Sequence, residues 1–244
     1  MSDLFTLENL VTFVSLSGLE IILGIDNIIF IAIIVYSIPK KRRARVRFFG
    51  VTLAIALRIV MLMGVSWVMG LVKPLLQIQG MEITGRSILL FFGGLFLVVK
   101  AVIEIYEMLT HKDVGNTRGR KKYDAKAEPK AIMQIIFVDL VLSFDSVLVA
   151  VGMVNNLYLI IPAILIAMVV MLVSAKKIGD FMHTNPSIKV VGLGFVLLIG
   201  MALLLGGIGI DIPKGYLYFA LFFTLFIEMV NIKIRKEKRH LHDH

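Results

Sequence analysis

The chain of 244 residues contains no cysteine. This absence excludes disulfides, thiolate metal ligands and thiol nucleophiles, so any metal site would have to use oxygen or imidazole ligands. Charged residues are also scarce, at 18% of the chain, whereas 58% of the residues are hydrophobic. With its strongly positive mean hydropathy, this composition indicates a polytopic membrane protein and excludes a soluble domain.

Seven apolar stretches are long enough to cross about 30 Å of hydrocarbon. The predicted helices cover residues 10–35, 48–71, 88–108, 131–154, 158–175, 190–210 and 216–232. The first stretch follows acidic residues, exceeds the length of a signal-peptide core and lacks a small-residue cleavage site. We therefore expect it to remain in the mature protein. The expected fold is all-α, a single transmembrane domain of seven helices.

The net charge of +9 could indicate nucleic-acid binding, but the basic residues are distributed by topology. Most of them lie after the first, third and fifth predicted helices and after the seventh, within residues 40–47, 112–130, 176–189 and 233–239. The positive-inside rule places these segments in the cytoplasm, the N-terminus outside and the C-terminus in the cytoplasm. The expected partner is a lipid bilayer, and we expect no nucleic acid.

Two apolar segments repeat the same acidic pattern. Aligning residues 17–33 with residues 136–152 places Glu20 on Asp139, Asp26 on Asp145 and Asn27 on Ser146. The copies lie in the first and fourth predicted helices, so they enter the membrane from opposite faces, as in the inverted repeats of transporters. The predicted organisation is a three-helix repeat (10–108), a cytoplasmic linker (109–130), a second three-helix repeat (131–210), a seventh helix (216–232) and a basic cytoplasmic tail (233–244).

Inversion predicts two layers of carboxylates, on either side of the bilayer midplane. Six residues of helix rise by about 9 Å, which would place Glu20 near the depth of Asp145, and Asp26 near that of Asp139. The same six residues turn the two carboxylates of a straight helix about 120° apart. We therefore predict a local break at Gly24 in the first copy and at Ser143 in the second, which would bring the side chains together and free backbone carbonyls.

Four carboxylates inside the membrane indicate an ion site, because each costs about 3 kcal/mol at the bilayer centre. Carboxylate, amide and hydroxyl oxygens suit Mn²⁺, Mg²⁺ or Ca²⁺, and we favour manganese or calcium as a transported ion rather than a permanently bound cofactor. Four carboxylates exceed the charge of one divalent ion, so protons or a basic residue must balance the rest, which predicts exchange with protons. The candidate metal ligands are Glu20, Asp26, Asn27, Asp139, Asp145 and Ser146.

Other charged residues lie within the predicted helices. Arg58 is expected to act as a counter-ion to the carboxylates. Lys100 and Glu104, four residues apart, are expected to form a local ion pair. Glu228 either lines an exit path or reaches water near the inner end of the seventh helix.

These features resemble the TerC family of integral membrane proteins. The resemblance rests on the two acidic motifs, the basic stretch after the first helix and the closing run from Phe226 to Met229, and it covers about residues 8–234. In size the chain is similar to short bacterial members that lack cytoplasmic regulatory domains. Because the family includes manganese exporters, the resemblance implies manganese efflux, with Glu20, Asp26, Asp139 and Asp145 at the matching positions. The family is named for tellurium resistance, but tellurite is an anion that four carboxylates should repel.

The sequence thus predicts a bacterial inner-membrane transporter that exports a divalent cation, with manganese as first candidate, in exchange for protons. One alternative is a membrane partner that supplies metal to exported proteins or anchors a metal or tellurium stress-response complex. Another is export of a small cationic metabolite, which would require an aromatic or roomy pocket. We do not expect an enzyme, because the predicted helices hold neither cysteine nor histidine. The sequence leaves the oligomeric state open.

Overall fold

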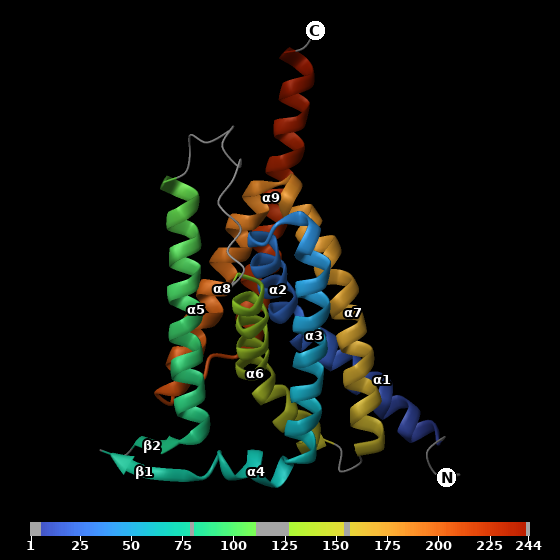
Figure 1. Ribbon diagram of the computed structural model, residues 1–244, viewed down its shortest axis with the longest axis vertical. Coiled ribbons are helices and arrows are strands. Elements are labelled where there is room, and N and C mark those ends of the chain that lie inside the picture. The colour runs from blue at the N-terminus through green and yellow to red at the C-terminus, as the bar shows by residue number, and fades with distance from the viewer. Residues whose placement is uncertain (1–5, 79–80, 111–126, 154–156, 243–244) are drawn as a thin grey trace.

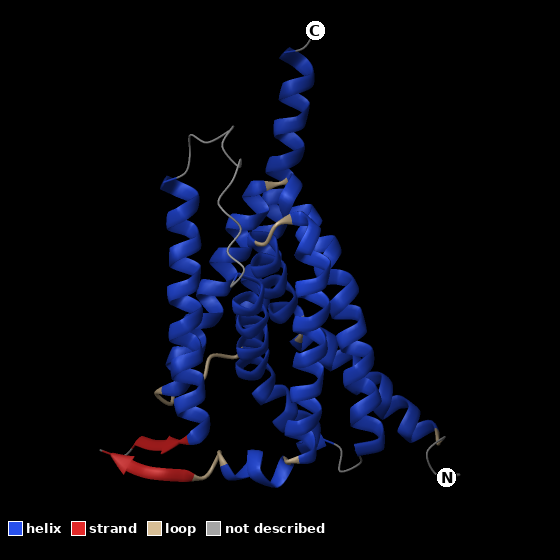
Figure 2. Cartoon of the chain, in the orientation of Figure 1, coloured by secondary structure: helices blue, strands red, loops and turns tan. Residues whose placement is uncertain are grey.

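The computed structural model describes residues 6–78, 81–110, 127–153 and 157–242. Helices dominate, with one small antiparallel hairpin (Figures 1 and 2). The elements in chain order are α1 (Leu7–Leu23), α2 (Ile25–Ser37), α3 (Lys40–Met63), α4 (Val65–Gly70), β1 (Pro74–Ile78), β2 (Met81–Thr84), α5 (Gly85–Thr110), α6 (Ala127–Met153), α7 (Leu157–Thr184), α8 (Pro186–Gly207) and α9 (Lys214–His242).

Six helices of the described chain are individually long and apolar enough to cross a membrane, namely α3, α5, α6, α7, α8 and α9. The consecutive helices α1 and α2 pass the same test together, with a bend of 43° between them. Counted as one bent span, this pair brings the number to seven. The predicted all-α polytopic fold is therefore confirmed.

The bend between α1 and α2 lies at Gly24, where a break was predicted. Gly24 ends α1 with its N–H bonded to the carbonyl of Ile21, and α2 starts at the next residue. The corresponding prediction for Ser143 is wrong, because α6 continues through it without interruption. Its hydroxyl donates a hydrogen bond to the backbone carbonyl of Asp139, one turn earlier, so this polar side chain is satisfied inside the helix.

Several helix boundaries differ from those predicted. Helix α3 starts at Lys40, so the basic stretch is helical rather than a loop; Pro39 directly precedes it, where a missing N–H costs no hydrogen bond. The same helix ends at Met63, and α4 and the hairpin follow where a continuous span to residue 71 was predicted. The predicted tail is helical as far as His242. Of the predicted linker, residues 111–126 lie outside the described residues.

The packing of the helices has the symmetry that two inverted repeats predict, in which each helix of one half corresponds to a helix of the other. The most extensive packing is between α5 and α8, followed by α3 against α6, and α1 and α2 against α7. Exchanging the α1–α2 pair with α6, α3 with α7, and α5 with α8 maps these pairs onto one another. The repeat itself stays a prediction. Helix α9 packs mainly on α8 and leaves most of its surface exposed.

Helix α2 forms the centre of the molecule (Figure 1). Ten consecutive residues from Asp26 to Val35 are buried, so this helix is enclosed on all sides rather than on one face. The two chain ends lie at opposite ends of the molecule, with α4 and the hairpin near the N-terminus and the start of α3 toward the C-terminal end (Figure 1). An odd number of crossings requires this arrangement.

Close packing of α5 against α8 depends on glycine at position 200. A Cβ added there would lie 2.9 Å from a methyl carbon of Val98 and 3.0 Å from the carbonyl oxygen of Gly94. We expect Gly200→Ala to destabilise the protein by about 1–3 kcal/mol, the usual cost of overpacking. Thermal unfolding of the purified protein in detergent measures this effect.

The matched control is Gly194→Ala on the same helix, where an added Cβ meets no atom within 4 Å. Because alanine has the higher helix propensity, this variant should be as stable as the wild type or more so. Equal melting temperatures for the two variants would contradict the assigned role of Gly200.

Candidate functional site

A buried ion-pair cluster lies where α1, α3 and α6 meet. Arg58 of α3 donates from Nη1 to Oε2 of Glu20, at 3.1 Å, and from Nη2 to Oδ1 of Asp139, also at 3.1 Å. The three residues are only 1–2% exposed. We call Glu20, Arg58 and Asp139 the buried cluster. The guanidinium compensates charge that would otherwise be very costly to bury.

Two polar side chains complete the surroundings of the cluster. Asn27, in the first turn of α2, donates from Nδ2 to Oδ1 of Asp139 at 3.1 Å. Ser146 of α6 donates to the carbonyl of Ser143 at 3.1 Å, and its hydroxyl lies beside the carboxylate of Glu20. The bend at Gly24 brings Glu20 and Asn27, on two differently directed helices, to the same cluster.

Three acceptor oxygens of this region have no hydrogen-bond partner among the described residues. They are Oε1 of Glu20, Oδ1 of Asn27 and Oδ2 of Asp139, and all are buried. Leaving such an acceptor unpaired costs about 1–3 kcal/mol. Carboxylate and amide oxygens are also the ligands that hard divalent cations prefer. The chemistry of these three atoms therefore fits a cation.

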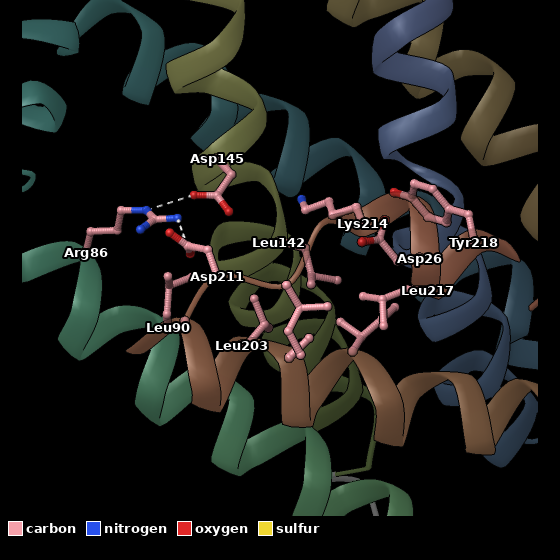
Figure 3. Close-up of a pocket in the computed structure, with 14 residues that line it drawn as sticks. Asp26, Arg86, Leu90, Leu142, Asp145, Leu203, Asp211, Lys214, Leu217 and Tyr218 are labelled. Carbon is pink, nitrogen blue, oxygen red and sulfur yellow. Dashed lines mark hydrogen bonds and ion pairs between the residues drawn. The ribbon is translucent and has the colours of Figure 1, made fainter. Parts of the chain in front are cut away.

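A second polar region is a small pocket, which Figure 3 shows. Its cavity measures about 50 Å³, enough for a few water-sized groups. Arg86, at the start of α5, contacts Asp145 of α6 at 3.1 Å and Asp211 of the α8–α9 connection at 3.6 Å. Aliphatic side chains, among them Leu90, Leu142 and Leu203, form much of the remaining wall.

Asp26 connects the pocket to the buried cluster. It lines the pocket from α2 and interacts electrostatically with Lys214, while Tyr218 stands close by on α9 (Figure 3). Its neighbour in the chain, Asn27, contacts Asp139 of the cluster. Asp26 is 3% exposed, and its Oδ1 accepts a bond from the backbone N–H of Asn27 at 3.0 Å.

The four carboxylates have different neighbours in the two copies of the repeat, and the predicted depths of the two layers stay a prediction. Glu20 shares Arg58 with Asp139, whereas Asp26 and Asp145 line the pocket. The second copy lies in one continuous helix, α6, whereas the first copy bends at Gly24. Six residues on a straight helix leave Asp139 and Asp145 about 120° apart, so they face different neighbours.

The structure thus brings Glu20, Asn27, Asp139 and Ser146 together, and it places Asp26 and Asp145 in the pocket. No group of three or more acidic or histidine side chains in the described part of the chain is close enough to hold a metal ion by itself. In this conformation Arg58 stands between the two carboxylates of the cluster and forms the ion pairs that a counter-ion requires.

The other charged residues form separate contacts. The Lys100–Glu104 ion pair is confirmed at 2.8 Å, and Lys189 adds a second contact to Glu104 at 3.4 Å. Glu228 pairs with Arg235 at 2.9 Å toward the end of α9 and does not belong to the buried cluster.

Sequence reasoning missed the pocket residues Arg86, Asp211, Lys214 and Tyr218. Arg86 and Lys214 lie two residues before the predicted helices 88–108 and 216–232. No spacing pattern links Arg86 to Asp145, which follows 59 positions later. The available signal was that each charged residue directly flanks an apolar span, but such residues are common at membrane surfaces.

Comparison with known proteins places this chain in a family. The profile of the integral membrane protein TerC family matches residues 5–240. A UPF0053 protein of Haemophilus influenzae is 42% identical over 229 residues, covering 94% of this chain and 95% of the relative. The UPF0053 inner membrane protein YgdQ of Escherichia coli K12 is 40% identical, with 93% of each chain covered.

Longer relatives match as well. The UPF0053 inner membrane protein YoaE of Escherichia coli K12 is 40% identical over 87% of this chain, which covers only 40% of YoaE. No solved structure matches the fold. The match to the family profile extends over nearly the whole chain, and two relatives are similar over nearly their full length, so the chain belongs to the TerC family of integral membrane proteins.

Proposed function

We propose that this protein is a transporter of the bacterial inner membrane that exports a divalent cation, with Mn²⁺ as first candidate, in exchange for protons. One observation carries the proposal. Glu20 and Asp139 each contact Arg58 through one carboxylate oxygen, and their other carboxylate oxygens are buried with no hydrogen-bond partner in the described structure. The amide oxygen of Asn27 is likewise buried and without a partner there. A membrane anchor would have no use for such groups.

The ligand chemistry supports a hard divalent ion. Carboxylate and amide oxygens suit Mn²⁺, Ca²⁺ and Mg²⁺, and a thiolate site for a softer ion is excluded because the chain has no cysteine. Manganese comes first because the resemblance to manganese exporters implies it. The cavity of about 50 Å³ is too small for an organic cation of appreciable size, which disfavours the cationic-metabolite alternative.

The buried charges suggest how the ion is exchanged. Glu20, Asp26 and Asp139 carry three negative charges when ionised, and Arg58 carries one positive charge, so the formal sum is −2. One divalent ion balances this sum, and two protons do so equally well. The proposed exchange of one ion for two protons keeps the membrane interior neutral in both states.

The arrangement of the two ends is compatible with alternating access. The pocket lies at the end that carries the hairpin, which the positive-inside rule places outside. Toward the opposite end, Lys189 of α8 contacts both Glu104 of α5 and the ring of Tyr36 of α2. Arg42 of α3 pairs there with Glu128 of α6. These contacts join α2, α5 and α8 to one another, and α3 to α6, at the end proposed to be cytoplasmic.

Transport by the purified protein in liposomes tests the proposal. We expect Mn²⁺ flux that needs no other protein and that accelerates when a proton gradient opposes the ion gradient. Asp180→Asn serves as the control, because Asp180 is exposed on α7 and belongs neither to the cluster nor to the pocket, and its flux should equal that of the wild type.

Binding of Mn²⁺ without flux would instead support a membrane partner that supplies metal to other proteins. Flux that is independent of pH would contradict the proton exchange but not the ion site. A panel of Mn²⁺, Ca²⁺ and Mg²⁺ in the same liposomes identifies the preferred ion.

A further inference from the structure

Arg58 is held in an unusual way for a buried arginine. It is the largest of the fully buried side chains in the described chain. A guanidinium normally binds one carboxylate through two parallel N–H bonds. Here each terminal nitrogen contacts a different carboxylate once, at 3.1 Å, and Nε has no partner among the described residues. The guanidinium therefore uses only part of its binding capacity.

The two carboxylates that contact Arg58 also have unused hydrogen-bonding capacity. The oxygens of Glu20 and Asp139 that do not contact Arg58 are buried and unpartnered. Two carboxylates that share one positive charge, with an amide oxygen of Asn27 beside them, offer a divalent ion more than they offer a guanidinium. The side chain of Arg58 thus stands where a small cation would find the strongest attraction.

We propose that Arg58 is a tethered competitor: its guanidinium holds the site while no ion is bound, and the transported divalent ion displaces it. This inference rests on the proposed function. A cation on the same chain acts at a high effective concentration, so it lowers the apparent affinity of the site for the ion. A transporter benefits from this competition, because an ion bound by two buried carboxylates would otherwise leave very slowly.

Asp26 is the group that can receive the displaced guanidinium. It is buried, interacts electrostatically with Lys214 and, more weakly, with Arg58, and lies next to Asn27 in the chain. With Arg58 on Asp26, the pair of Glu20 and Asp139 is free to bind one divalent ion. Each of the four buried charges, on Glu20, Asp26, Arg58 and Asp139, then has a partner.

Direct binding of Mn²⁺ to the purified protein, measured by electron paramagnetic resonance, tests the inference. We expect Arg58→Ala to bind Mn²⁺ about tenfold more tightly than the wild type, or better. Millimolar guanidinium chloride should compete with Mn²⁺ in Arg58→Ala, where it can take the vacated position, and should have little effect in the wild type. Sodium chloride at equal ionic strength controls for screening.

The matched control is Arg235→Gln, which removes an arginine whose carboxylate partner, Glu228, lies outside the cluster. It should leave both the affinity and the response to guanidinium as in the wild type. If Arg58→Ala does not fold, Arg58→Lys provides the same test, because lysine keeps the charge but replaces the two terminal nitrogens that contact Glu20 and Asp139 by a single one. Arg58→Lys should bind Mn²⁺ more tightly than the wild type does.

Weaker Mn²⁺ binding by folded Arg58→Ala, or equal sensitivity to guanidinium in the two proteins, would overturn the inference. The proposed function fails separately. If the wild type shows no flux in liposomes but Arg58→Ala binds Mn²⁺ more tightly and in competition with guanidinium, transport is refuted and the tethered competitor stands. If the wild type transports Mn²⁺ and Arg58→Ala binds Mn²⁺ more weakly, the proposed transport stands and the tethered competitor is refuted.

Discussion

Asp139→Asn is expected to abolish divalent-ion transport. Asp139 has contacts to both Arg58 and Asn27 through Oδ1, while its Oδ2 is buried and unpartnered in the described structure. Asparagine keeps the size and one acceptor oxygen but removes the charge. One divalent ion would then exceed the remaining negative charge of the region by one unit. Because loss of even an outer partner of a metal ligand costs about 10- to 100-fold in affinity, we expect flux to fall by about 100-fold or more.

Flux of Mn²⁺ in liposomes at equal protein density measures this effect, with binding of Mn²⁺ in detergent as a second measurement. The control is Asp180→Asn, which makes the same chemical change at an exposed position of α7. It should transport like the wild type. If Asp139→Asn is folded and retains wild-type flux, the buried cluster is not the ion site.

The spans and the bend at Gly24 could be predicted because both depend on local sequence. An apolar run of about twenty residues has one stable environment, the hydrocarbon of a bilayer. Between two buried carboxylates, a glycine is the residue that most weakly opposes a break in a helix. The structure reproduces both features, with a bend of 43° at this position.

The break at Ser143 could not be excluded from the alignment alone. Serine is a poor helix former in water, but inside a helix its hydroxyl can bond to the carbonyl four residues earlier. Ser143 does so with Asp139. Two aligned positions can therefore differ in geometry, since glycine has no side chain with which to satisfy the backbone.

The sequence could not show which acidic side chain pairs with which arginine, and the reason is different. Which carboxylate meets which arginine depends on how α3, α5 and α6 rotate about their axes, and hydropathy fixes that rotation only coarsely. Arg58 was predicted to be a counter-ion, but its two partners were not identified. Arg86 lies outside the predicted helix 88–108, yet it belongs to the first turn of α5 and bridges Asp145 and Asp211.

Gly24→Leu is the second substitution with a large expected effect. A Cβ at this position would lie 3.0 Å from Cε of Met171 on α7 and 3.1 Å from the carbonyl oxygen of Glu20. Leucine adds three further carbons that need the same space. It also favours a continuous helix by about 1 kcal/mol relative to glycine. Both effects act against the bend between α1 and α2.

The bend is what allows Glu20 and Asn27 to reach one cluster from two helices. If α1 and α2 straighten, Asn27 moves away from Asp139, or Glu20 moves away from Arg58. Displacing the groups that orient a ligand typically costs about 10- to 100-fold in metal affinity. We therefore expect Gly24→Leu to lower Mn²⁺ affinity and flux by at least about tenfold, with a loss of stability of about 1–3 kcal/mol from overpacking.

Gly18→Leu provides the comparison within the same helix, because an added Cβ at Gly18 meets no atom within 4 Å. It raises helix propensity equally but leaves the bend intact, so its affinity and flux should match those of the wild type. If both variants lose transport to the same degree, helix propensity or general damage to α1 explains the loss. If only Gly24→Leu does, the bend itself positions the site, and the glycine between the two acidic residues is part of the binding machinery.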